Sequence, residues 1–397
     1  MAATDAQSGH DPKPPGGFGH VPLRDIARAF AKLGAIGFGG GVGMLALIRQ
    51  EVVAKRRWVD DAQLSVGVAM GQMTPGPFVS NYAEYVGYEL RGMRGMVTAH
   101  VSLMLPCLVL MLVLSVLYFR FGSIPLVTRV FAGVQPVVVG ILAWATWSIG
   151  RTNIRGWRSV IIGAIASAAL FLKVDVLLVV VGCGVLGIVL SGAWRRVPPS
   201  GSATLMDAGY LLPAVFFAAP AGQSVWRRAG ELALVFLKIG AATFGGGFAA
   251  IPFLQHEVVD VRHWLTMQEF IDGVALGQVT PGPVAITSGF VGFKVLGLAG
   301  AIIAYLGTFL PSFLMLWGLI HIYRRVQYNR VVKGFLSGVM PAVTGMILTA
   351  TVFIGRTAIS GPVPAVVAPL ALCLLLRFRV EPVWLILGGA LVGLVMG

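Results

Sequence analysis

The sequence predicts an all-α polytopic membrane protein made of two homologous, inverted repeats that contain broken or re-entrant helices. Hydrophobic residues make up 57% of the 397-residue chain and charged residues only 12%, whereas a soluble protein carries about 25% charged residues. The two halves share a long series of matching positions, and equivalent loops of the two halves carry opposite charge bias. A soluble fold is therefore not expected.

Long windows without Asp, Glu, Lys or Arg predict the membrane-spanning helices. The windows 96–118 and 130–149 each reach the roughly 20 apolar residues that a helix needs to cross a hydrocarbon core of ~30 Å. In the first half we expect a glycine-interrupted helix over 24–48 and a broken element formed by 61–72 and 78–90. Full spans are expected near 95–119, 128–149, 158–172 and 175–193, and the second half repeats this plan.

The two halves arise from a sequence duplication. Residues 30–77 align with 236–283 at a constant shift of 206, and after a one-residue gap the match continues to Arg151 and Arg356. Repeats of this kind define structural units. We expect a disordered tail over 1–23, a first repeat over 24–194, a linker over 195–228 and a second repeat over 229–397. The tail does not resemble a cleavable signal peptide, and the apolar stretch within 205–222 either lies at the interface or adds a span.

Basic residues in equivalent loops indicate that the repeats are inverted. Three pairs of equivalent loops can be compared. The loop after the first helix carries more basic residues in the first half, the second loop carries more in the second half, and the third again carries more in the first half. These residues are Arg49, Lys55, Arg56 and Arg57 against Arg262; Arg120 and Arg129 against Arg324, Arg325, Arg330 and Lys333; and Arg151, Arg155 and Arg158 against Arg356. Under the positive-inside rule, equivalent loops then lie on opposite faces. Either a re-entrant hairpin or a membrane-crossing linker would produce this inversion.

The net charge of +14 does not indicate a nucleic-acid partner, because Lys and Arg gather in short loops without a basic, aromatic-interleaved stripe. Cys107, Cys183 and Cys373 are far apart in apolar windows, and the six histidines form no paired ligand motif. Neither a metal nor a cofactor is expected.

Two helix-breaking motifs, each present in both halves, predict the binding site. Proline removes a backbone donor and glycine lowers helix propensity, so such breaks persist in lipid only where they are buried or line a cavity. A helix that restarts after a break presents free N–H groups and the positive end of its dipole, which suits an anion. The alternative is a set of tight turns or close helix crossings. The residues expected to bind substrate are Gly39, Gly40, Gly41, Gln72, Thr74, Pro75, Gly76, Gly245, Gly246, Gly247, Gln278, Thr280, Pro281, Gly282, Lys32 and Lys238.

Two matched pairs of charged residues accompany these breaks. Lys32 and Lys238 each precede the first glycine of their triplet by seven residues, which is two helical turns. Each lysine either reaches toward the anion or snorkels to the interface. Glu51 and Glu257 are candidates for gating or proton coupling, the alternative being interfacial carboxylates beside basic loops.

These motifs resemble the chromate ion transporter (CHR) family in its long, two-domain form. The resemblance rests on Phe38-Gly39-Gly40-Gly41, Trp58, Gly71-Gln72 and Thr74-Pro75-Gly76-Pro77 with their second-half copies, and it covers residue 30 to the C-terminus. It implies a multi-pass protein of the bacterial inner membrane that exports chromate and confers chromate resistance, with sulfate as a related oxyanion. The second half departs at Ala285 and Ile286, where the first has Val79 and Ser80.

Other functions stay open at this point. A transporter of another tetrahedral oxyanion such as sulfate, or an anion channel, would share the chemistry of the breaks. A membrane enzyme would need an intramembrane cluster of catalytic residues, and the sequence shows no such pattern. The expected partners are a small oxyanion and the lipid bilayer, and a homo-oligomeric state is left open.

Overall fold

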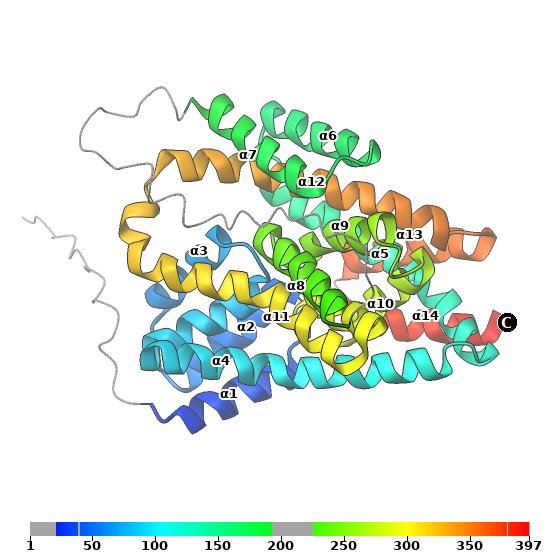
Figure 1. Ribbon diagram of the computed structural model, residues 1–397, viewed down its shortest axis with the longest axis horizontal. Helices are drawn as coiled ribbons and strands as arrows, with labels where there is room; N and C mark the ends of the chain where they lie inside the picture. The colour runs from blue at the N-terminus through cyan, green and yellow to red at the C-terminus, as the bar shows by residue number, and fades with distance from the viewer. Residues whose placement is uncertain (1–20, 39, 193–224, 379, 397) are drawn as a thin grey trace, which may run out of the picture.

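The computed structural model describes residues 21–38, 40–192, 225–378 and 380–396, which are almost entirely helical and contain no strand (Figure 1). This confirms the predicted all-helical class. The predicted tail lies largely outside the described residues, as do Gly39 and the apolar stretch within 205–222. The second half begins with α8 at Val225, inside the last four residues of the range predicted as linker.

The two halves contain equivalent helices in the same order, and the second half has two additional short helical turns, η4 and η6. The first half consists of α1 (Leu23–Ile36), α2 (Gly40–Arg49), the π-helical turn η1 (Gln50–Lys55), α3 (Asp61–Met73), α4 (Phe78–Phe121), α5 (Pro125–Asn153), α6 (Trp157–Phe171) and α7 (Val176–Ser191). The second half consists of α8 (Val225–Ala242), η4 (Gly247–Ala249), α9 (Ala250–Gln255), the π-helical turn η5 (His256–Val261), α10 (Met267–Val279), η6 (Val284–Ile286), α11 (Thr287–Val326), α12 (Arg330–Ala358), α13 (Pro362–Phe378) and α14 (Pro382–Met396).

Local sequence explains where the broken elements start and stop. Capping boxes at the equivalent positions Asp60 and Thr266 start α3 and α10. Both helices end at the threonine of the proline-glycine break, which is extended because a residue before proline is pushed out of the helical region. The predicted split between 61–72 and 78–90 is therefore present, and the second half repeats it.

Four helices are long and apolar enough to cross a membrane: α4, α5, α11 together with η6, and α12. A stripe of apolar side chains, between 42% and 54% exposed, runs along one face of α4 and of α11. The stripe consists of Val97, Val101, Leu105 and Val109 on α4 and of Ile302, Leu306, Leu310 and Leu314 on α11. Because residues four apart share a helix face, each stripe is a continuous surface suited to lipid.

The last two helices of each half are shorter than the roughly 20 residues that cross a hydrocarbon core, although α6 and α7 lie where spans are predicted over 158–172 and 175–193. Helices α6 and α7 contain 15 and 16 residues, or about 22–24 Å at 1.5 Å per residue, which is less than the ~30 Å core. A turn at Lys173, whose φ is +60°, and the N-cap at Asp175 separate the two helices and limit their length.

The halves interlock through these short helices. Helix α7 packs on α12 of the second half, and α14 packs on α5 of the first half. Glycines permit the close approach: a Cβ on Gly338 would lie 2.0 Å from the carbonyl oxygen of Cys183, and one on Gly133 would lie 2.2 Å from that of Gly389. Small residues at such crossings are typical of membrane helices.

Equivalent connections of the two halves lie at opposite ends of the molecule. Figure 1 shows the α4–α5 connection at the end where the chain terminates, and the α11–α12 connection at the other end of the long axis. The helix breaks lie between these ends, where α1, α3, α8 and α10 stop.

Candidate functional site

The four helix breaks meet in two crossed pairs. The amide of Gly76 donates to the carbonyl oxygen of Thr243 at 2.5 Å, and the amide of Gly282 donates to that of Gly37 at 2.9 Å. Gly37 and Thr243 are equivalent positions, each just after the first helix of its half. Each proline-glycine break therefore binds the glycine-rich break of the opposite half, which brings the predicted motifs together.

Two glycines permit this contact. Gly76 and Gly282 have φ values of +96° and +99°, a region that glycine adopts without penalty. A Cβ on Gly76 would lie 2.4 Å from Oγ of Ser312, and one on Gly282 would lie 2.6 Å from Sγ of Cys107. Cys107 and Ser312 are themselves equivalent, since each follows the intrahelical proline of its half. The long helix of one half thus packs directly on the break of the other.

Polar atoms of the first break are bonded within the protein. Thr74 accepts a hydrogen bond from Nδ2 of Asn81 at 2.8 Å, while Oγ of Ser312 lies 2.6 Å from the carbonyl oxygen of Pro75 and 2.7 Å from Oδ1 of Asn81. The Thr280 hydroxyl of the second break donates to the carbonyl oxygen of Leu276 at 2.8 Å. In this conformation the two threonine hydroxyls are directed toward protein atoms.

A small cavity lies at the second break. It is lined by Phe38, Trp144, Phe248, Gly277, Gln278, Thr280, Gly282, Val284, Glu381, Pro382 and Val383. The side chain of Gln278 is buried, and its Nε2 has no hydrogen-bond partner among the described residues. The equivalent Gln72 is exposed, so the two predicted glutamines occupy different environments.

The cavity volume is ≈ 20 Å³. One water molecule requires about 10–15 Å³ on this measure, so the cavity is smaller than a tetrahedral oxyanion. An anion bound at Gln278 would require the breaks to move apart. The conformation described here is therefore closed around the second break.

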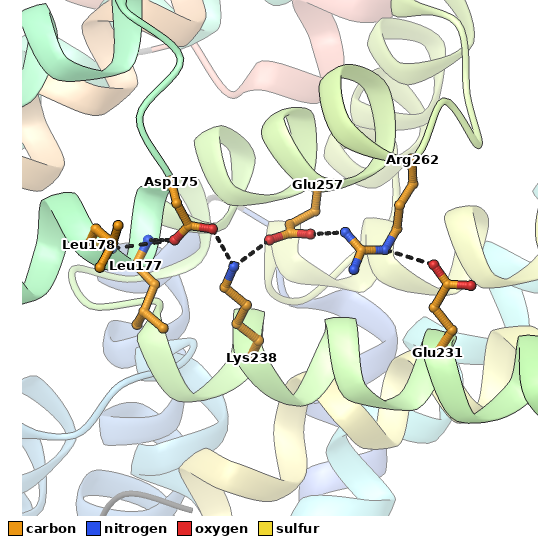
Figure 2. Close-up of polar contacts among 7 residues, drawn as sticks. All are labelled: Asp175, Leu177, Leu178, Glu231, Lys238, Glu257 and Arg262. Carbon is orange, nitrogen blue, oxygen red and sulfur yellow. Dashed lines mark hydrogen bonds and ion pairs between the residues drawn. The ribbon is translucent and has the colours of Figure 1, made fainter. Parts of the chain in front are cut away.

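A chain of ion pairs engages the second-half lysine. Nζ of Lys238 lies 2.5 Å from Oδ2 of Asp175 and 2.8 Å from Oε1 of Glu257. Arg262 bonds to Glu257 and, at 3.2 Å, to Glu231. Figure 2 shows these five side chains in one line. Asp175 lies at the start of α7, Glu231 and Lys238 lie on α8, Glu257 lies in η5, and Arg262 follows η5.

Equivalent positions carry the same five charges in a second set, four in the first half and one, Glu381, in the second half, but this second cluster is not closed. The equivalent pairs are Asp25 and Glu231, Lys32 and Lys238, Glu51 and Glu257, Arg56 and Arg262, and Glu381 and Asp175. Glu51 pairs with Arg56 at 2.6 Å. Lys32 is exposed, forms no ion pair with another described residue, and lines a cavity of ≈ 370 Å³ together with Glu51 and Lys55.

Arg56 stabilises the charged form of Glu51. The hydrogen bond between the two side chains holds the pKa of the Glu51 carboxyl below its ordinary value, despite the opposing effect of burial. A carboxylate of lowered pKa stays ionised at neutral pH.

Buried carboxylates outside the repeated motifs, among them Glu84, Glu89 and Asp272, were missed by the sequence reasoning. Glu84 lies on α4 next to His100, and Asp272 lies on α10, where it accepts hydrogen bonds at 2.8 Å from both Tyr118 and Gln135. A signal was present, because ionisable residues within apolar helices are costly and tend to mark functional positions. Neither Glu84 nor Asp272 has a carboxylate at the equivalent position of the other half, so the repeat comparison did not reveal them.

The interlocked repeats, exposed apolar stripes and crossed breaks are those of a multi-pass helical membrane protein. The chain matches the sequence model of the family described as chromate transporter twice, over residues 24–188 and 230–394. The chain therefore belongs to the chromate transporter family, as its motifs indicate.

Relatives match along most of the chain. A chromate transport protein of Cupriavidus metallidurans is 31% identical over 94% of this chain and 93% of its own length. A probable chromate transport protein of Synechococcus elongatus is 30% identical over 84% of this chain and 85% of its own. A chromate transport protein of Pseudomonas aeruginosa is 30% identical over 88% of this chain and 84% of its own. No solved structure matches.

Proposed function

We propose that this protein exports chromate from the bacterial cytoplasm across the inner membrane and thereby confers chromate resistance. The observation that carries the proposal is the buried Nε2 of Gln278, which has no partner within the described part of the chain, at the point where opposite breaks meet. The names of the relatives supply the substrate. A buried amide donor without a partner costs free energy, and an oxyanion oxygen would satisfy it.

The chemistry around Gln278 suits an oxyanion. The helical segment η6 restarts at Val284, directly after the break and within the cavity lining, so its first N–H groups supply positive partial charge. The amide donors are neutral, whereas Glu381, which also lines the cavity, is acidic, so an anion binds here only when Glu381 moves away as the breaks open.

The two charged clusters support alternating access. The cluster of Asp175, Lys238 and Glu257 forms a closed gate, whereas Lys32 and Glu51 border an open cavity. In the opposite state we expect Glu381 to pair with Lys32 while Asp175 leaves Lys238. Equivalent clusters in opposite states are what a carrier requires, whereas a channel would need a continuous path.

Loop charges and the opposite placement of equivalent connections support inverted repeats. We expect the loop of residues 55–57 to be cytoplasmic and the loop around Arg262 to be periplasmic, so the open cavity at Lys32 faces the cytoplasm. Single cysteines in each loop, labelled from outside intact cells with an impermeant reagent, test this orientation. Equal labelling of the two loops would remove the inverted arrangement.

Gln278 should contribute to chromate affinity and Gln72 should contribute less. We expect Gln278→Ala to raise the half-saturating chromate concentration by about tenfold, because a hydrogen bond to a charged group is worth roughly 1.5–3 kcal/mol. Gln72→Ala is the matched control, since its side chain is exposed, and its effect should stay below about twofold. Equal effects of the two substitutions would place the substrate elsewhere.

A related oxyanion such as sulfate is the second candidate substrate, because it shares the tetrahedral shape and double negative charge of chromate. The amide donors at the second break do not discriminate between the two ions. Sulfate competition in the transport assay decides between them.

A further inference from the structure

A buried chain of three titratable side chains joins α4 to α11 away from the charged gates. Oε1 of Glu84 lies 2.8 Å from Nδ1 of His100, and Nε2 of His100 lies 2.9 Å from the Tyr305 hydroxyl. The Glu84 side chain is 0% exposed, and its Oε2 has no partner among the described residues.

The surroundings of this chain are apolar. The His100 ring packs edge-on against Phe309 and Phe313, with centroid distances of 6.1 and 5.6 Å. Cys107 is the next titratable group near Tyr305. Among the described residues, no side chain of α1, α2, α3 or α10 forms an ion pair or hydrogen bond with Glu84. No Lys or Arg in the described ranges forms an ion pair with Glu84, unlike Glu51 and Glu257.

The repeat shows that the fold does not require this carboxylate. His100 and Tyr305 occupy equivalent positions at a shift of 205, the shift that also relates the kinks at Gly92 and Gly297. At the same shift, the counterpart of Glu84 is Gly289. The second half thus forms the same break and the same kinked helix without an acidic group, although burying one is costly.

We propose that Glu84 and His100 form the site that binds the proton whose movement drives anion transport. The inference rests on the proposed function and adds the coupling ion. Oε2 of Glu84 accepts the proton from one side of the membrane and releases it to the other side after the conformational change. His100, which is partly exposed, provides the path by which the proton reaches the carboxylate.

The position of the pair explains how proton binding would affect the substrate site. Glu84 follows Asn81 by three residues on α4, and Tyr305 precedes Ser312 by seven residues, or two turns, on α11. Asn81 and Ser312 hold the first break against α11 through Thr74 and Pro75. Neutralising Glu84 weakens its attraction for His100, so the contact between α4 and α11 changes next to the break.

Purified full-length protein in liposomes tests this site. Two activities are compared with radiolabelled chromate: accumulation driven by an imposed pH gradient, and exchange of internal for external chromate without a gradient. We expect Glu84→Gln to lower gradient-driven accumulation by about tenfold or more, within the roughly 5–150-fold range of coupled sites. Exchange should stay within about twofold, because glutamine keeps the shape and can still bond His100.

His321→Gln provides the matched control. His321 also pairs with a tyrosine across α4 and α11, with its Nε2 3.2 Å from the Tyr88 hydroxyl, but that pair is exposed. This variant should retain both activities, whereas His100→Gln should behave like Glu84→Gln.

Each other outcome overturns a specific claim. Gradient-driven accumulation that survives in Glu84→Gln, or parental protein that exchanges chromate but does not respond to a pH gradient, contradicts the proton site. Equal loss of both activities in Glu84→Gln means that the group is structural. Parental protein without exchange or accumulation refutes the proposed transport function itself.

Discussion

Replacing Gly76 or Gly282 with leucine is expected to abolish chromate export while the protein still inserts in the membrane. Both glycines have positive φ, where a side chain costs about 1–2 kcal/mol. A Cβ would also collide with Ser312 or Cys107, which separates the break from the long helix of the other half. Displacing binding groups by about 1 Å can cost on the order of 10²-fold in rate, so transport should fall by at least that much.

Matched glycines separate the collision from the backbone strain. Gly92 and Gly297 also have positive φ values, +57° and +59°, but a Cβ there meets nothing within 4 Å. Gly92→Ala and Gly297→Ala should therefore lose little transport, whereas Gly76→Ala and Gly282→Ala should lose much of it. Uptake and membrane content are measured for all variants. If both leucine variants express normally and transport at the parental rate, the break is only a structural turn.

Lys238→Ala should reduce transport by about 5–30-fold. The substitution leaves Asp175 and Glu257 without their shared cation. Lys238 is 32% exposed, so water compensates in part, and the loss corresponds to about 1–2 kcal/mol rather than the full cost of a buried pair. The weakened gate should appear as slower chromate transport together with an increased passive leak of chromate.

Arg57→Ala is the control for Lys238→Ala, because Arg57 belongs to a basic loop and forms no ion pair with another described residue. Its effect on transport should be small. Lys32→Ala should also reduce transport, because Lys32 takes the place of Lys238 when the gates exchange. Equal small effects of all three substitutions would return the two lysines to a snorkelling role.

The helix breaks were predictable because their chemistry is local. Proline cannot continue α3 or α10, and the residue before it becomes extended, whatever surrounds them. Because the same motif occurs in both halves, the same break could be predicted at two positions of the chain. The all-helical class followed from composition and from the long windows without charge.

The contacts between the breaks were not predictable, because they join distant residues. Nothing in the motif of Gly76 indicates that its amide binds Thr243 rather than a ligand. The interlocking of α7 with α12 is likewise a tertiary feature. The hydrogen bonds of Thr74 with Asn81 and of Thr280 with Leu276 are also contacts that the motifs do not specify.

The difference between matched residues was also hidden from the sequence. Lys32 and Lys238 occupy equivalent positions, yet one is exposed and the other is held by two carboxylates. A repeat comparison treats such residues as equal, whereas a carrier in any single conformation must place them in different environments. The same limitation concealed Glu84, which only one half contains.

Uptake of radiolabelled chromate into inverted membrane vesicles tests the central claim most directly. Inverted vesicles expose the cytoplasmic face, so an exporter moves chromate into the lumen. The account predicts energy-dependent accumulation of chromate above the external concentration. This accumulation should be absent from vesicles without the protein and lost in Gly282→Leu. The degree of competition by sulfate then measures the selectivity of the site. Equilibration without accumulation would indicate a channel, and uptake no greater than in vesicles without the protein would contradict chromate export.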